Sequence, residues 1–204
     1  MASIDYLKRP VTTVRRKDRQ LTDDEWMDRL LTMQPVGHMA FVWDDAPMIH
    51  SNIFWFDGPR IYWHTAAVGR LPAAFQQGPR RACFTVTELG RILPNYTPLE
   101  FSTEYASVVV YGTLRLVDDF AEKKRALEGL MTKYAPHLEP GRDYDPMPDE
   151  DVNQTSVFCL DVDSRVGKHN VKPADYPAYT LPVASFIDAE RDAGRATVKP
   201  KELS

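Results

Sequence analysis

The 204-residue sequence lacks the short motifs that identify several large classes of enzyme. It contains no G-x-G-x-x-G, no P-loop, no G-x-S-x-G, no H-E-x-x-H and no C-x-x-C. A Rossmann-type dinucleotide site, a P-loop nucleotidase, an α/β-hydrolase, a zinc peptidase and a thioredoxin-like redox centre therefore have no local support. Function has to be inferred from the order of longer segments.

Cysteines and long hydrophobic runs are also scarce. Cys83 and Cys159 lie far apart, each inside an apolar strand-like run, and we expect them to be buried thiols. Their pairing in an oxidising compartment stays open. No apolar run approaches membrane-spanning length, and no basic segment followed by an apolar one opens the chain. We therefore expect a soluble cytoplasmic protein that does not bind membranes.

An excess of positive charge is missing as well. The formal net charge is −4 and the cluster Arg15-Arg16-Lys17 is short, so nucleic acid is not the expected partner. With 43% hydrophobic and 26% charged residues the chain can bury one core. We expect an arm at residues 1–20, one domain at 21–170 and a tail at 171–204.

Hydrophobic patterning predicts more strand than helix. The expected strands are 38–43, 48–56, 61–67, 80–87, 105–117 and 155–162, and the expected helices are 22–33, 71–77 and 119–135, with a further short helix possible at 185–193. The connections look like hairpins and do not alternate strand with helix, so a doubly wound parallel sheet does not fit. The pattern favours a mainly β fold, a closed or partly open antiparallel barrel.

Two segments have no clear period. Residues 88–104 carry two prolines and are predicted as a loop, long enough to have a function or to cover a site. Residues 139–154 are acidic and rich in proline, but they lack the glycine and the distal glutamate of an EF-hand, so we expect a solvated loop. Gly112 interrupts the strongest predicted strand, which indicates a bulge or a close approach of another backbone.

One corner of the sequence suits an anion. The run His64-Thr65-Ala66 ends a predicted strand, and Gly69-Arg70 leads into the helix at 71–77. Helix-end N–H groups, a glycine that permits close backbone approach and an arginine fork can together hold a phosphate. Alternatively, Thr65 only caps the helix and Arg70 is a solvated charge.

Three histidines lie on separate predicted strands. His38, His50 and His64 show no local ligand spacing, so we expect no metal site and regard these side chains as hydrogen-bonded or facing a ligand.

The ordered segments resemble a known superfamily. They are R-R-K-D-R (15–19), an F-D-G turn, I-Y-W-H-T-A-x-x-G-R, G-P-R-R-A-C-F-T-V and Y-x-S-V-V-x-Y-G-x-L-x-x-V-D-D. Over residues 14–170 this order resembles the pyridoxamine 5′-phosphate oxidase-like FMN-binding split-barrel proteins, and most of all their 5-nitroimidazole-resistance branch. The tail at 171–204 is not covered.

The resemblance implies a six-stranded antiparallel split barrel of Greek-key type with about three helices, formed by residues 21–170. It also implies a homodimer with FMN in clefts at the dimer interface. The implied cofactor-binding residues fall into three groups along the chain: Ile49, His50, Ser51 and Asn52, then His64, Thr65, Ala66, Gly69 and Arg70, and finally Tyr105, Ser107 and Lys168.

The chain departs from the true oxidases of that superfamily at charged positions. Ile49 and Phe54 stand where those enzymes carry an arginine and a lysine, and Leu71 follows Arg70 where they have a second basic residue. The tryptophan and arginine pair near their C-terminus is also missing. Oxidation of a B6 vitamer is therefore not expected, and FMN binding would rest on Thr65, Arg70 and main-chain amides.

These features lead to three hypotheses. The first is an FMN-dependent oxidoreductase that reduces a small organic substrate, similar to nitroimidazole reductases, with electrons from NAD(P)H or from a partner reductase. In it His64 donates a proton, or alternatively only positions the cofactor. The second is a non-catalytic module that holds a flavin-like cofactor or haem. The third is a barrel without a cofactor that acts through its dimer surface.

Overall fold

The computed structural model describes residues 8–182 and 184–194, and its main feature is one antiparallel sheet. Eight strands form this sheet in the order β3-β2-β6-β7-β8-β5-β4, with β1 added against β8. Their bounds are β1 Gln20–Leu21, β2 Gly37–Trp43, β3 Ala46–Asn52, β4 Trp55–Phe56, β5 Arg60–Ala66, β6 Arg80–Leu93, β7 Ser102–Leu116 and β8 Thr155–Asn170. Since β1 and β4 have two residues each, six longer strands remain, and the predicted mainly β fold is confirmed.

Short helices accompany the sheet. They are α1 Asp24–Met33, α2 Arg70–Ala74, α3 Phe120–Tyr134, α4 Asp149–Asn153 and α5 Phe186–Asp192. The three predicted helices and the optional fourth are present. Helix α4 was not predicted, because an acidic segment beside prolines looks like a solvated loop. Its carboxylates lie in the first turn, where they favour a helix, and Val152 is fully buried.

The strand predicted at 48–56 is wrong as a single element. Only Trp55–Phe56 pairs with β5, whereas β3 pairs with β2 through a two-residue hairpin. Asp44 and Asp45 both have positive φ (51° and 55°), the conformation that a tight hairpin turn needs. The chain leaves the sheet at Phe54, whose N–H donates to the Tyr134 hydroxyl at 2.9 Å.

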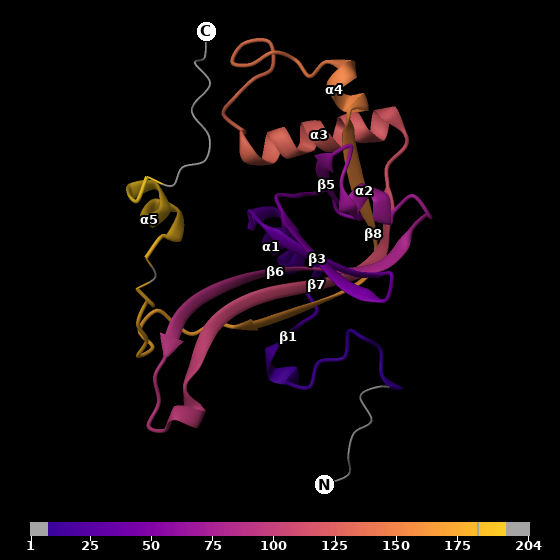
Figure 1. Cartoon of the computed structure of the whole chain (residues 1–204). Helices are drawn as coiled ribbons and strands as arrows, with labels where there is room; N and C mark the ends of the chain where they lie inside the picture. Colours follow the sequence, from indigo (N-terminus) through magenta and orange to yellow (C-terminus); the bar gives the residue numbers. More distant parts are fainter. Residues whose placement is uncertain (1–7, 183, 195–204) are drawn as a thin grey trace.

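The loop predicted at 88–104 is wrong as well. β6 continues to Leu93 and β7 starts at Ser102, so the connection is shorter. A register shift between Leu89 and Ile92 breaks the alternation of side chains, which hides the strands from a period-based prediction. β8 also runs beyond the predicted 155–162. Figure 1 shows β6, β7 and β8 as long curved strands lying side by side, with α3 across one end.

Gly112 behaves as predicted. The register of β7 against β8 shifts between Tyr111 and Gly112, which marks a bulge. A Cβ atom on Gly112 would lie 2.1 Å from the main-chain oxygen of Asp161. The close approach of β8 therefore requires glycine here.

Two hydrophobic clusters occupy opposite faces of β5. Ile61 and Trp63 belong to the cluster inside the barrel, together with Phe84 and Phe158 from other strands. Tyr62 belongs to the second cluster, which packs against α3. This cluster also includes Leu127, Leu130 and the buried thiol of Cys159. Because side chains alternate along a strand, His64 shares the α3-facing side with Tyr62.

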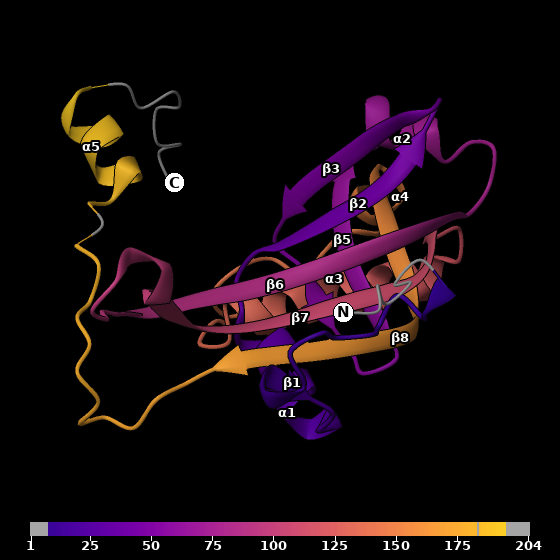
Figure 2. The same ribbon diagram turned by 90° about the horizontal axis from the view of Figure 1, so that it is seen from below.

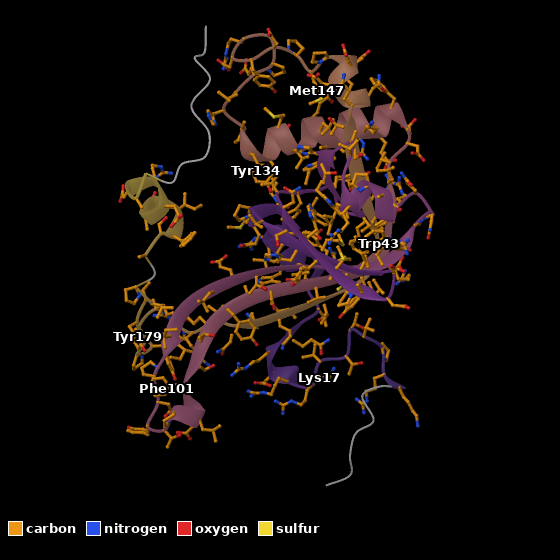
Figure 3. All side chains as sticks on the ribbon, in the orientation of Figure 1. Lys17, Trp43, Phe101, Tyr134, Met147 and Tyr179 are labelled. Carbon is orange, nitrogen blue, oxygen red and sulfur yellow. The ribbon has the colours of Figure 1, made fainter. Side chains whose placement is uncertain are left out.

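Segments near both ends of the described chain contact the sheet. Val14 is buried, and Gln20 in β1 pairs with Lys168 of β8. The C-terminal segment follows the far ends of β6 and β7, where Ile92 and Tyr179 exchange main-chain hydrogen bonds. Figure 3 shows Phe101 and Tyr179 in this region, and Figure 2 shows α5 apart from the sheet. Within residues 8–182 and 184–194, no helix has the length and hydropathy to cross a membrane.

Candidate functional site

A side chain joins β3, at one end of the sheet, to β5, which lies next to the short end strand β4. Asn52 on β3 donates from Nδ2 to the main-chain oxygen of His64 on β5 at 2.9 Å. No ladder of main-chain pairs links these two strands within the described residues. The barrel is therefore split between β3 and β5, and we refer to this boundary as the seam. The side-chain amide of Asn52 bridges it.

A cleft of about 370 Å³ opens beside the seam, and we refer to it as the site cleft. Its lining residues come from β2, β3, the end of β5 and α2: Phe41, Met48, Ile49, His50, Thr65, Ala66, Val68, Gly69, Arg70, Leu71, Pro72 and Ala74. The volume lies in the usual range for a small-molecule site. Half of the predicted cofactor-binding residues line this cleft.

Arg70 supplies the positive charge of the site cleft. Its side chain is exposed and takes part in no hydrogen bond or ion pair within the described residues. Gly69 precedes it with φ of 141°, a conformation that favours glycine. The helix predicted at 71–77 is α2, which has only five residues. So short a helix contributes little dipole, and the arginine itself must provide most of the attraction for an anion.

The two site histidines differ in position. His50 lines the site cleft, and partial burial lowers the pKa of its imidazole. His64 does not line the cleft, since it lies on the α3-facing side of β5. Burial also lowers the pKa of His64, and its Nδ1 has no hydrogen-bond partner in the described part of the chain. Both side chains are therefore held towards the neutral form.

Ser51 and Asn52 also lie outside the lining of the site cleft. The Ser51 hydroxyl is 2.7 Å from Nδ1 of His38 on β2. The two residues are register partners across the β2–β3 hairpin. His38 is therefore hydrogen-bonded, one of the two states expected for it, and it does not line the site cleft. The apolar wall formed by Phe41, Met48 and Val68 was missed, because nothing local marks it.

The remaining predicted residues lie on the long strands. Ser107 on β7 is the register partner of Lys168 on β8, and Tyr105 is the partner of Asn170. None of them lines the site cleft. Within one chain the structure does not bring this group together with Arg70 and His50. A site that uses both groups would require a second copy of the chain.

Three other features of the described residues have less support as functional sites than the site cleft. A hollow of about 450 Å³ lies between α3 and residues 136–147, but it contains no predicted site residue. Among the residues described, no three His, Cys, Asp or Glu side chains come close enough to hold a metal ion. Cys83 is half-buried and Cys159 is buried, and both are free.

Comparison with solved structures identifies the same fold in flavin-binding and haem-binding proteins. A flavocytochrome, Anf3, from Azotobacter vinelandii superimposes with a TM-score of 0.72 at 22% identity, covering 95% of this chain and 89% of the other. A FAD- and heme-binding protein from Mycobacterium smegmatis gives 0.67 at 20% identity, covering 91% of each chain. A protein from Bacteroides thetaiotaomicron, named as a candidate for 5-nitroimidazole antibiotic resistance, gives 0.60 at 19% identity, covering 74% and 86%.

No curated protein matches the chain. The family model for pyridoxamine 5′-phosphate oxidase matches residues 23–169, which is most of the sequence and contains every predicted site residue. The split barrel and the order of its segments agree with that match. The chain belongs to the pyridoxamine 5′-phosphate oxidase family.

Proposed function

We propose that this protein is a flavoprotein that binds FMN in the site cleft and reduces a small organic substrate. The observation that carries the proposal is the unpaired guanidinium of Arg70 at a cleft of this family's fold. An exposed arginine without an internal partner is free to bind the phosphate of a ligand in bidentate fashion. The flavin-binding domain would span 21–170, with the arm and tail outside it.

The residues of the site cleft fit a flavin phosphate and a flat ring. Arg70 would hold the phosphate, and the main chain at Gly69 permits close approach. Ile49, which is 71% exposed, and Val68, which is 84% exposed, offer apolar surface that a ring system would cover. FMN, when bound, supplies two-electron transfer between a donor and a substrate.

A proton source belongs to this proposal. His64 is the donor that the sequence suggests, and His50 is the histidine that lines the cleft. Because burial lowers the pKa of both, the protonated fraction is small at neutral pH, and transfer from the acid form would strengthen as the pH falls.

The proposed assembly is a homodimer. It would bring the group on β7 and β8, with Ser107 and Lys168, next to the site cleft of the second copy. NAD(P)H or a partner reductase would supply electrons, and nitroaromatic compounds are the substrates to test first. We place the protein in the cytoplasm because Cys83 and Cys159 are both free thiols.

A second candidate function is haem binding, alone or together with a flavin. Two of the similar structures are described as a flavocytochrome and as a FAD- and heme-binding protein. Neutral imidazole is the form that binds iron, and burial favours that form at His50 and His64.

The absorbance spectrum of freshly purified protein tests both candidates. Flavin bands that bleach when NADPH is added, and that return when a nitroaromatic substrate is added, would support the oxidoreductase. A Soret band that shifts in the His50→Ala variant would support haem binding at the site cleft. A spectrum without either chromophore, unchanged after incubation with FMN and with haemin, would contradict both.

A further inference from the structure

A second and larger cleft adjoins the site cleft, and we refer to it as the outer cleft. Its volume is about 730 Å³. It spreads over the outward side of the sheet and is bounded by the N-terminal arm at Val11. Its lining residues are Val11, Ala40, Phe41, Val42, Pro47, Met48, Pro79, Arg80, Arg81, Ala82, Cys83, Tyr111 and Ser164.

The two clefts share part of their walls at the β2–β3 hairpin. Phe41 and Met48, which are register partners, line both of them. Helix α2 connects the clefts on the other side: Arg70 at its first residue lines the site cleft, and Arg80 donates from Nε to the main-chain oxygen of Ala74 at its last residue. The two clefts therefore adjoin each other both at the hairpin and at α2.

The outer cleft combines a cation with a flat apolar floor. Arg81 is 68% exposed in its side chain, although the chain as a whole is acidic. It donates to Thr113 and forms an ion pair with Asp163. Ala40 and Val42 from β2 and Tyr111 from β7 present small and aromatic groups to it. A guanidinium beside such a floor suits a phosphate attached to a planar base.

We propose that the outer cleft binds the adenosine diphosphate part of a dinucleotide whose other half lies in the site cleft. This inference rests on the proposed flavin site. The adenosine diphosphate group can come from FAD, in which it is joined to the flavin, or from NAD(P)H bound as the electron donor. In both cases Arg81 holds a phosphate in competition with the Asp163 carboxylate.

That competition gives two variants with opposite expected effects. Titration calorimetry with ADP on the full-length protein measures the affinity directly and needs no turnover. Arg81→Ala should weaken ADP binding about 10-fold or more, the scale of a lost charge-assisted hydrogen bond. Asp163→Asn frees Arg81 and should strengthen ADP binding several-fold. Lys124→Ala is the matched control. Lys124 on α3 also pairs with an aspartate, Asp149 on α4, but neither residue lines the outer cleft.

Further titrations identify the source of the group. If it belongs to FAD, FAD binds more tightly than FMN, Arg81→Ala removes the difference, and bound FAD blocks ADP. If it belongs to NAD(P)H, FMN and FAD bind alike, and NAD(P)H competes with ADP on FMN-loaded protein. ADP binding that depends on Arg81 without any flavin binding would overturn the proposed function and exclude FAD as the source of the group.

The proposal is overturned if ADP does not bind the wild-type protein, or if Arg81→Ala and Asp163→Asn both leave its affinity within twofold. A change of oligomeric state in these variants, measured by light scattering and without any effect on ADP, would also overturn it. The outer cleft would then be an interface between two copies of the chain.

Discussion

The side-chain amide of Asn52 donates to the main-chain oxygen of His64 at 2.9 Å and so joins β3, at one end of the sheet, to β5 near the other end. The same side chain lies 3.5 Å from Nε2 of His50, which lines the site cleft. One amide therefore connects the seam of the barrel with the candidate site. Its loss would affect the stability of the fold and the shape of the cleft together.

Replacing Asn52 with Asp tests the seam, because Asp has the same shape but cannot donate when ionised. The carbonyl of His64 then loses its donor, and we expect the free energy of unfolding in urea to fall by about 1–3 kcal/mol. Asn95→Asp is the control, since Asn95 bonds only to the next residue in an exposed loop. Equal stability of the two variants would show that the seam does not depend on this hydrogen bond.

Arg70→Ala should weaken FMN binding by about 1.5–3 kcal/mol, because a charge-assisted hydrogen bond to phosphate is lost. Riboflavin, which has no phosphate, should bind as tightly to the variant as to the wild type. Arg29→Ala serves as the control, since Arg29 is an exposed arginine on α1, away from the site cleft. Equal losses for FMN and riboflavin, measured by flavin fluorescence, would assign Arg70 a structural role.

The histidine variants distinguish a proton donor from a positioning residue. Burial lowers the pKa of His50 and His64, so the rate of substrate reduction should fall as the pH rises through a midpoint below 6.5. The proposed role of His64 predicts that His64→Ala slows reduction about 10²-fold and removes this pH dependence, with FMN retained. His50→Ala is the parallel test. A pH profile unchanged in both variants would exclude either histidine as the donor.

The same shifts affect stability. A histidine whose pKa is lowered on folding binds protons more readily in the unfolded chain. The stability that it contributes is present above pH 6.5 and is lost as the pH falls. As the pH falls below 6.5, the free energy of unfolding should therefore decrease more for the wild-type protein than for the double variant His50→Gln/His64→Gln. An identical pH dependence of the two unfolding free energies would contradict the burial of these imidazoles.

The C-terminal segment is held by a nearly buried carboxylate. Glu104 is 8% exposed and accepts from Arg91 at 2.7 Å and from the Lys172 N–H at 2.8 Å. Arg91 lowers the pKa of Glu104 to about 2, so its contribution to stability is present above pH 4.5 and is lost as the pH falls towards 2. Glu104→Gln should speed proteolysis within residues 171–182 at neutral pH. Glu100→Gln, in the exposed loop, should leave the rate of proteolysis unchanged. Equal cleavage rates in the two variants would contradict the role of Glu104 in holding the C-terminal segment.

How much the sequence could reveal is clearest at the β3 strand. The run from Ile53 to Phe56 has strong strand propensity and carried the strand predicted at 48–56, whereas β3 itself contains Pro47 and Asn52, which strands disfavour. The turn at Asp44-Asp45 was predictable, but the departure of the chain from the sheet at Phe54 has no local signal. That departure leaves β3 paired with β2 and only Trp55–Phe56 paired with β5. In the same way, the break in alternation between Leu89 and Ile92 concealed the far half of β6.

The candidate site was predicted in part for a similar reason. Gly69 and Arg70 form a local pattern at the end of a strand, and the cleft is where the structure places them. The direction of His64 depends on which face of β5 is covered by α3, a tertiary fact that the local sequence does not contain. The apolar wall of Phe41, Met48 and Val68 was equally hidden, since it combines β2 and β3 with a segment that follows β5.

The central claim is that the site cleft binds a flavin. Titration of the purified protein, freed of any chromophore, with FMN tests it most directly, with flavin fluorescence as the readout. The account predicts saturable binding of one FMN per chain, weakened in Arg70→Ala and unchanged in Arg29→Ala. Fluorescence that stays that of free FMN at every protein concentration, or binding that Arg70→Ala leaves untouched, would contradict it.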